Sequence, residues 1–134
     1  MLGSHCIKTW STYQNAFALS SAEAELYAMV EGVSRGKGLQ TLGMEMGFAD
    51  LQNAIGLGTD SSAARSFVNR RGLGRMRHLQ LRDLWLQKEI RDGNLLVDKV
   101  AGVNNPADLM TKVLRVGEII ERLRRMNIDS KWRH

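Results

Sequence analysis

Cysteine and proline, two residue types that constrain the backbone of small folds, are almost absent from the sequence. A single cysteine, Cys6, and a single proline, Pro106, occur among 134 residues. One cysteine has no disulfide partner within the chain, and this cysteine usage suits a reducing, intracellular compartment. The sequence also has no run of eighteen apolar residues and no apolar signal-peptide segment at its start. We therefore expect no membrane partner.

Several catalytic signatures are also missing. The three histidines show no metal-ligand spacing with one another or with Cys6, so a zinc site is not expected. Gly72 and Gly74 lack the third glycine of a dinucleotide fingerprint, and no phosphate-binding Gly-Lys-Ser/Thr loop occurs. These absences exclude the common zinc and nucleotide-cofactor classes.

The residues that are present suit one soluble domain with unevenly distributed charge. The composition is 43% hydrophobic and 25% charged, which is typical of globular proteins. The segment from Arg65 to Arg91 contains eight Lys/Arg and two Asp/Glu, and the segment from Arg115 to His134 contains six Lys/Arg and three Asp/Glu. The other segments hold five basic and nine acidic residues. An acidic cluster beside a basic surface suits a metal-dependent nuclease, but ordinary solvated helix charges give the same pattern.

Strand and helix patterns alternate along the chain and predict an α/β fold. Ser20 and Glu23 have the spacing of a capping box, so a helix is expected to begin there. Asn105 followed by Pro106 predicts a second helix start. The other predicted elements are strands over residues 5–11, 53–60 and 95–100, an extended piece over 16–19, a short helix after residue 61 or 62, and helices over 79–91 and 117–126. The last helix is expected to turn four apolar residues inward: Ile119, Ile120, Leu123 and Met126.

Three carboxylates lie where strand and helix ends can converge. Glu25 is one turn into the first helix, and Gly32 and Gly36 on the same side leave room for a metal ion or a backbone. Asp60 ends a glycine-bearing strand, the position from which α/β folds commonly present ligands. Asp108 lies in the first turn of the helix predicted after the proline. Carboxylate oxygens suit Mg²⁺, and such a set predicts two-metal phosphodiester hydrolysis.

Two of these carboxylates also have a purely structural interpretation. Asp108 near a helix N-terminus is favourable to the helix dipole without any metal. Asp60, beside Ser61, has the character of a turn or cap residue. Glu23 is best explained as the partner of the capping residue, so it is not counted as a ligand. For Asp60 and Asp108 both interpretations stay open on the residues alone.

Separate segments, in order, resemble the ribonuclease H domain of copia-type retrotransposon polyproteins. They are IKTWS with ALSSAEAELY at residues 7–11 and 18–27, TDSSAA at 59–64, RH with LWLQ at 77–78 and 84–87, and VNNPADLMTKVL at 103–114. The resemblance covers about residues 2–114. It predicts an RNase H-like domain over residues 1–114 and a basic helical extension over residues 115–134.

The resemblance implies a mixed sheet flanked by helices that hydrolyses the RNA strand of RNA–DNA hybrids during reverse transcription. It implies Mg²⁺ as cofactor, with Mn²⁺ as the alternative. Glu25, Asp60 and Asp108 match the second, third and fourth of the family's four metal-binding catalytic carboxylates. The first belongs to a strand before the turn at Leu2-Gly3. The chain is therefore expected to lack that first strand and most of the second, and to be inactive alone.

The expected partners are an RNA–DNA hybrid and the upstream reverse transcriptase region of the same polyprotein. The resemblance implies a cytoplasmic retroelement particle, with the nucleus as the alternative. Arg70, Arg71, Arg75 and Arg77 are expected to hold backbone phosphates with little sequence preference. The alternative is a non-catalytic, truncated remnant that binds nucleic acid or a protein partner through this basic stretch.

Overall fold

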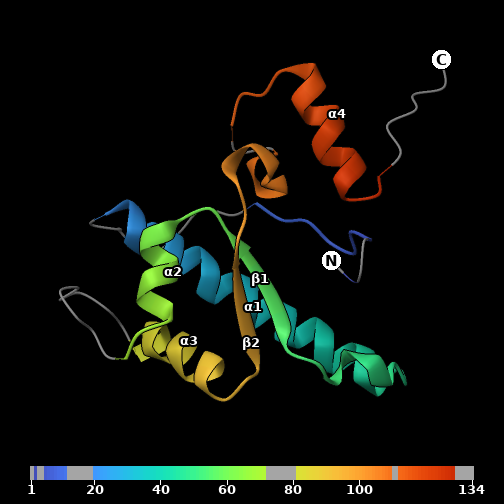
Figure 1. The fold of residues 1–134 in the computed structure, drawn as a ribbon. Helices are drawn as coiled ribbons and strands as arrows, with labels where there is room; N and C mark the ends of the chain where they lie inside the picture. Colours follow the sequence, from blue (N-terminus) through green and yellow to red (C-terminus); the bar gives the residue numbers. More distant parts are fainter. Residues whose placement is uncertain (1, 3–4, 12–19, 72–80, 110–111, 129–134) are drawn as a thin grey trace. The chain divides into compact units, whose positions relative to one another are not determined.

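The computed structural model describes residues 2, 5–11, 20–71, 81–109 and 112–128 (Figure 1). The chain divides into a central unit, Gln14–Lys99, and a terminal unit, Met1–Tyr13 with Val100–His134. Helices combined with a two-stranded parallel sheet confirm the predicted α/β class. The arrangement is compatible with the RNase H-like fold that the resemblance implies. The predicted boundary after residue 114 stays a prediction.

The central unit begins with a long helix, α1 (Ser21–Glu45). Its start is where the sequence predicts it, because the Ser20 hydroxyl accepts a hydrogen bond from the Glu23 backbone N–H at 3.2 Å. This bond satisfies one of the unpaired amides of the first turn. The helix runs through its glycine-rich second half without interruption and ends in a turn at Gly47, which has a φ of 93°.

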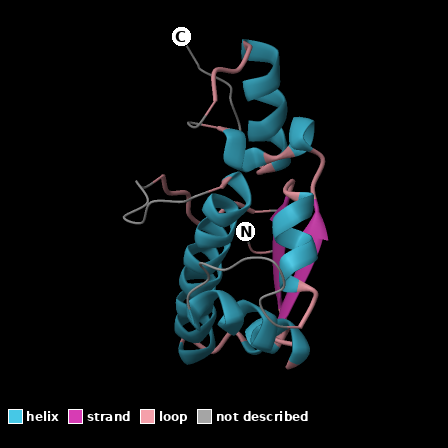
Figure 2. Ribbon diagram, turned by 90° about the vertical axis from the view of Figure 1, so that its left-hand side faces the viewer, coloured by secondary structure: helices cyan, strands magenta, loops and turns pink. Residues whose placement is uncertain are grey.

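Two parallel strands and two helices complete the central unit. Strand β1 (Ile55–Thr59) leads into α2 (Ser62–Val68), which is capped by the hydroxyl of Ser61. Helix α3 (Leu81–Arg91) then leads into β2 (Leu95–Lys99). Figure 2 shows the two strands side by side. A parallel pair needs a crossover connection, and the helices between the strands provide it.

One face of the small sheet packs on the helices. The buried side chains come from α1, α2, α3 and β2: Leu26, Met29, Val33, Ala64, Phe67, Val68, Leu86 and Leu95. Ile55 and Leu57 of β1 pack against this cluster. The opposite face carries Gly56 and Leu96, and Leu96 is exposed. Phe67, which is fully buried, alone contributes about 1.5–3 kcal/mol through removal of its apolar surface from water.

A polar contact joins α1 to α3 within the central unit. The ammonium of Lys37 pairs with the carboxylate of Glu89, which also accepts a hydrogen bond from the Asn94 side chain at 3.1 Å. The hydrogen bond from Lys37 lowers the pKa of Glu89, outweighing the opposing effect of its burial. The same ammonium lies 5.7 Å from the centre of the Trp85 ring. The two helices are therefore held by charge as well as by apolar packing.

The terminal unit is built around α4 (Val116–Arg125). Two short 3-10 turns, Gly102–Asn104 and Pro106–Asp108, precede it, and the second of them contacts α4. The amino-terminal segment joins this unit through a hydrogen bond from the Cys6 N–H to the Met126 carbonyl at 3.3 Å. Among the described helices, none combines the length and hydropathy that a membrane span requires.

Two of the predicted elements differ in the structure. The strand predicted over residues 5–11 is wrong, because only an isolated antiparallel bridge between Leu2 and His5 forms there. The predicted helix after Asn105 is a single 3-10 turn, which ends because Leu109 leaves the helical region at ψ 132°. The start of that turn is as predicted, since the Asn105 side chain accepts the Ala107 N–H at 3.1 Å. The extended piece over 16–19 lies outside the described residues.

Candidate active site

Glu25 lies half-buried on α1, on the side of the helix that faces β1. A Cβ added at Gly32 would lie 3.9 Å from Leu57 Cδ1, and one added at Gly36 would lie 3.6 Å from two side-chain carbons of Ile55. Glu25 is seven residues before Gly32, which is close to two full turns, so it shares this stripe. The two glycines therefore let side chains of β1 approach the helix, and the expectation of a metal ion or a backbone beside them stays a prediction.

Asp60 follows β1 directly and is half-buried. The residues on either side of it are fixed by hydrogen bonds. Thr59 is buried, and its hydroxyl accepts the Ser61 N–H at 3.1 Å. Ser61 in turn caps α2 by accepting the Ala64 N–H at 3.2 Å. Ser61, and not Asp60, is therefore the cap of α2, while the turn interpretation of Asp60 stays open.

Glu25 and Asp60 come to the same end of the central unit. The pairing of Gly32 with Leu57 and of Gly36 with Ile55 means that α1 and β1 run in opposite directions (Figure 1). From Gly32 to Glu25 the helix rises about 10 Å. From Leu57 to Asp60 the strand advances about 10 Å in the same direction. Two carboxylates 35 residues apart in sequence are thus placed at the carboxyl end of β1.

Asp108 belongs to the terminal unit and is buried, with 6% of its surface exposed. Its Oδ1 lies 2.7 Å from the ammonium of Lys112, and its Oδ2 lies 3.5 Å from Nη2 of Arg122. The side chain of Lys112 is 57% exposed, whereas that of Arg122 is 5% exposed. Both carboxylate oxygens of Asp108 are therefore held by cations, one exposed to solvent and one buried.

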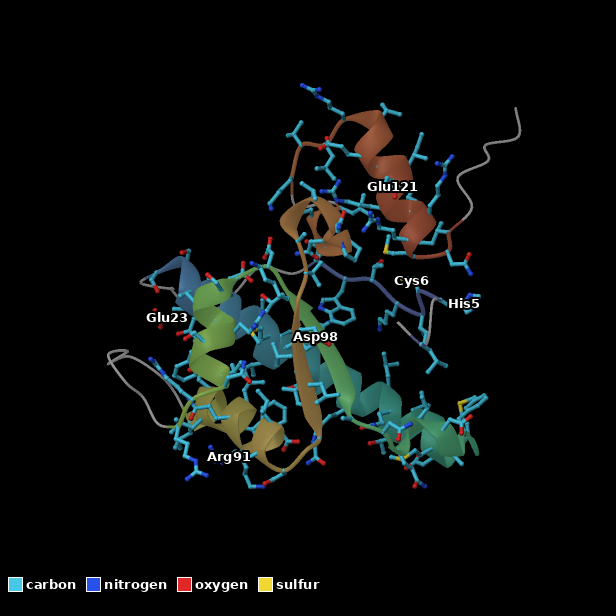
Figure 3. The ribbon with its side chains drawn as sticks, in the orientation of Figure 1. His5, Cys6, Glu23, Arg91, Asp98 and Glu121 are labelled. Carbon is cyan, nitrogen blue, oxygen red and sulfur yellow. The ribbon has the colours of Figure 1, made fainter. Side chains whose placement is uncertain are left out.

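The convergence of all three carboxylates on one metal stays a prediction. Among the described residues, no three His, Cys, Asp or Glu side chains are grouped so that they could hold a metal ion. Glu25 and Asp60 belong to the central unit and Asp108 to the terminal unit. Figure 3 shows another carboxylate near the sheet, that of Asp98 on β2, which is exposed and opposite Gly58 in the strand register.

The burial of Arg122 was not predicted from the sequence. Of the four apolar residues expected to face inward, Met126 is buried and Ile119, Ile120 and Leu123 are half-buried, yet the buried residue of α4 itself is Arg122. Arg122 and Met126 are four residues apart, so both lie on one face of the helix. The sequence did contain a signal for this burial. Arg122 lies four residues before Met126, and an arginine beside apolar residues can bury the aliphatic part of its side chain. Its partner could not be deduced.

Two of the four predicted phosphate-binding arginines fall within the described residues. Arg70 and Arg71 follow α2 and are exposed. The guanidinium of Arg70 lies 5.0 Å from the centre of the Phe67 ring, which orients its side chain at the surface. Arg75 and Arg77 lie outside the described residues.

Comparison with known proteins connects the chain to a mobile element. Over 112 residues it is 31% identical to the retrovirus-related Pol polyprotein from transposon TNT 1-94 of Nicotiana tabacum. The match covers 78% of this chain and 8% of that polyprotein. No family model and no solved structure matches the chain. The chain is thus similar to a small part of a Pol polyprotein, and this relationship supports an origin in a retrotransposon polyprotein.

Proposed function

We propose that the chain supplies most of the ribonuclease H active site of a copia-type retrotransposon polyprotein. The substrate is an RNA–DNA hybrid, the reaction is hydrolysis of its RNA strand, and the cofactor is Mg²⁺, with Mn²⁺ as a substitute. Glu25, Asp60 and Asp108 are the metal ligands in this proposal. The observation that carries it is the placement of Glu25 and Asp60 at one end of the central unit by the antiparallel packing of α1 on β1.

The donor chemistry of these residues fits a hard divalent cation. Glu25 and Asp60 both offer carboxylate oxygens, and both are half-buried, so they are screened from water without being sealed from it. Strand β2 ends at Lys99, the register partner of Thr59. The chain therefore leaves β2 at the same end of the sheet at which Asp60 follows β1.

The chemistry needs little from the protein besides position and charge. When bound, two divalent ions would activate a water and neutralise charge on the scissile phosphate. The chain's own part is to hold carboxylates in place. The Thr59 hydroxyl fixes the backbone at Asp60 through the Ser61 N–H, and Gly32 and Gly36 let α1 pack closely on Leu57 and Ile55 of β1. Exposed arginines would hold the phosphates of the duplex without reading sequence.

The test is metal-dependent cleavage of a labelled RNA–DNA hybrid. It is run on this chain and on the chain fused to the upstream two-strand segment of a copia-type ribonuclease H domain, because the resemblance puts a fourth carboxylate in that segment. Asp60→Asn and Glu25→Gln are each expected to lower the rate at least about a hundredfold, since each removes a charged metal ligand. Asp98→Asn is the matched control and should stay within about twofold, because Asp98 is an exposed carboxylate on β2. Equal losses in all three variants would refute the assignment.

Binding is tested separately from cleavage. Affinity for a hybrid should fall with salt concentration, and removal of one arginine–phosphate interaction should flatten the slope by about one unit. The variant replaces four arginines by alanine: Arg70, Arg71, Arg75 and Arg77. Arg91→Ala, which removes an exposed charge at the end of α3, is the control. An unchanged slope in the fourfold variant would mean that other residues bind the phosphates.

A non-catalytic, nucleic-acid-binding remnant is the second candidate, and one observation favours it. Both oxygens of Asp108 are held by cations, Lys112 and Arg122, which is the arrangement of a structural carboxylate. Salt-dependent hybrid binding without metal-dependent cleavage, in both forms of the chain, would select this candidate.

A further inference from the structure

The last part of α1 extends beyond the sheet. Gly36 packs against Ile55, which is the first residue of β1. Residues 37–45 therefore continue the helix past the start of the strand, for about 13 Å at 1.5 Å per residue (Figure 1). The short 3-10 helix Ala49–Gln52 folds back on this part of α1. The sheet thus leaves the carboxyl end of α1 uncovered.

Hydrogen bonds and close packing fix the chain reversal at this end. The side-chain amide of Gln40 donates to the carbonyls of Leu51 and Asn53 at 2.6 and 2.7 Å. Gly43 is buried, and a Cβ added there would overlap with Leu51 Cδ1, so the contact requires glycine. The Phe48 N–H donates to the Gly43 carbonyl at 3.0 Å. The backbone here is therefore ordered before any partner binds, which reduces the entropy lost on binding.

Three large apolar side chains are exposed on this ordered end. Leu42 is 52% exposed, Met46 67% and Phe48 54%. Leu42 and Met46 are four residues apart and share one face of the helix. The Phe48 ring adjoins that face, because its Cδ2 lies 4.0 Å from a Cβ built on Gly43. We call these three residues the α1-end patch. Adjacent exposed apolar side chains mark interaction sites, and aromatic residues and methionine are enriched in protein interfaces.

The charge around the α1-end patch is negative. Residues 38–64 contain no lysine or arginine, although the chain has 19 of them. Glu45 and Asp50 are both exposed, and Glu45 lies three residues from Leu42 on the helix. Glu45 is also the last residue of α1, where the helix dipole favours a cation over a carboxylate. A residue that opposes local stability beside exposed apolar side chains indicates a functional surface.

We propose that the α1-end patch binds a cationic, amphipathic α-helix of a partner protein. The apolar face of that helix covers Leu42, Met46 and Phe48, and its lysines or arginines lie beside Glu45 and Asp50. A helix suits a patch whose apolar residues are spaced along a helix themselves. The negative field opposes nucleic acid and anionic lipid, and it also opposes a symmetric pair of two such patches. The patch is at the opposite end of α1 from Glu25, so the inference does not depend on the proposed function.

The experiment measures the binding of two labelled synthetic peptides to the full chain by fluorescence anisotropy. Both peptides have leucines at helical spacing on one face, and their other face carries lysines in one peptide and glutamates in the other. The lysine peptide should bind at least about tenfold more tightly, because like charges across an interface oppose association. Replacing Met46 and Phe48 together by serine should weaken its binding at least about tenfold, because a few large anchors dominate such interfaces. Leu96→Ser is the matched control, since Leu96 is 58% exposed on β2, and it should change the affinity less than about twofold.

A charge reversal at Glu45 separates binding from stability. Glu45→Lys should weaken binding of the lysine peptide at least about fivefold, because it replaces an attractive charge by a repulsive one. The same variant should raise the urea midpoint, because it places a cation at the carboxyl end of α1. A residue with a purely structural role would not show these opposite effects. Asp98→Lys makes the same change on an exposed residue of β2 and should alter the affinity less than about twofold.

Several results would overturn the proposal. They are equal binding of the two peptides, and equal losses in Leu96→Ser and in the Met46 and Phe48 double variant. Sedimentation equilibrium of the chain alone tests the second copy as occupant, and a dimer that the double variant abolishes would put it there instead. Binding of phosphatidylserine vesicles or of an RNA–DNA hybrid that is lost in the double variant would likewise replace the protein partner. If the double variant does not fold, Glu45→Lys decides, and undiminished binding of the lysine peptide by that variant would refute the inference.

Discussion

The contact between α1 and β1 predicts opposite effects for two substitutions at one glycine. Gly36→Ala should stabilise the chain by about 0.5–1 kcal/mol, because alanine is favoured over glycine by that amount in a helix interior. The added Cβ would meet two carbons of Ile55 at 3.6 Å, which is ordinary van der Waals contact. Nothing in the surroundings therefore opposes the gain.

Gly36→Leu should do the reverse. Leucine gains almost as much helix propensity as alanine, but its three outer carbons would have to occupy the space that Ile55 fills. Overpacking of this kind costs about 1–3 kcal/mol, so the net effect is a destabilisation of up to about 2 kcal/mol. Gly38, in the same helix, is the control, because a Cβ added there meets no atom within 4 Å. Alanine and leucine at Gly38 should both stabilise.

Urea unfolding followed by circular dichroism measures all four variants against the parent chain. The expected order of midpoints places Gly36→Leu alone below the parent. If Gly36→Leu were as stable as Gly38→Leu, α1 would not hold Gly36 against β1. The placement of Glu25 beside the end of β1 would then be wrong as well, since it is worked out from the same stripe.

Three further substitutions test the contacts around this core. Glu89→Gln should lower stability at pH 7 by about 1–3 kcal/mol. Because Lys37 lowers the pKa of Glu89, this contribution is fully present above the usual Glu value of about 4.3 and is lost as the pH falls through the lowered pKa. The difference between variant and parent in unfolding experiments should therefore be smaller at pH 3 than at pH 7. Ser61→Ala should cost about 1 kcal/mol in urea unfolding through loss of the α2 cap, and an unchanged midpoint would contradict the cap. Gln87→Leu should cost about 1 kcal/mol in the same assay, because its buried amide donates to the Phe67 carbonyl at 3.0 Å, and a gain in stability would argue against that bond.

Local signals were enough to predict the central unit. The start of α1 needs only Ser20 and the amides of its own first turn, and β1 ends where a strand pattern gives way to a capping serine. The sequence could place Glu25 near the start of α1 and Asp60 at the end of β1, because local signals mark both of these ends. Their arrival at one end of the unit required the direction of α1 relative to β1, which no local pattern specifies.

Interactions between distant segments were not predictable in the same way. The burial of Arg122 depends on carbonyls at Gly102 and Asn105 and on Asp108, all at least fourteen residues away. The segment that begins at Cys6 has a strand-like composition, yet its first N–H bonds to Met126. A strand needs a neighbour to pair with, and hydrophobic pattern alone cannot supply one.

The division of the chain into a continuous and a discontinuous unit has a consequence for its synthesis. A ribosome releases Gln14–Lys99 as one stretch, so the central unit can fold while translation continues. The terminal unit must wait longer, because the bond between Cys6 and Met126 joins residues 120 positions apart. It forms only after α4 has been made, and it carries the slow kinetics of long loop closure. During that interval, the segment that carries Asp108 has been made but Arg122 has not. Asp108 is therefore the last of the three carboxylates to reach its folded position.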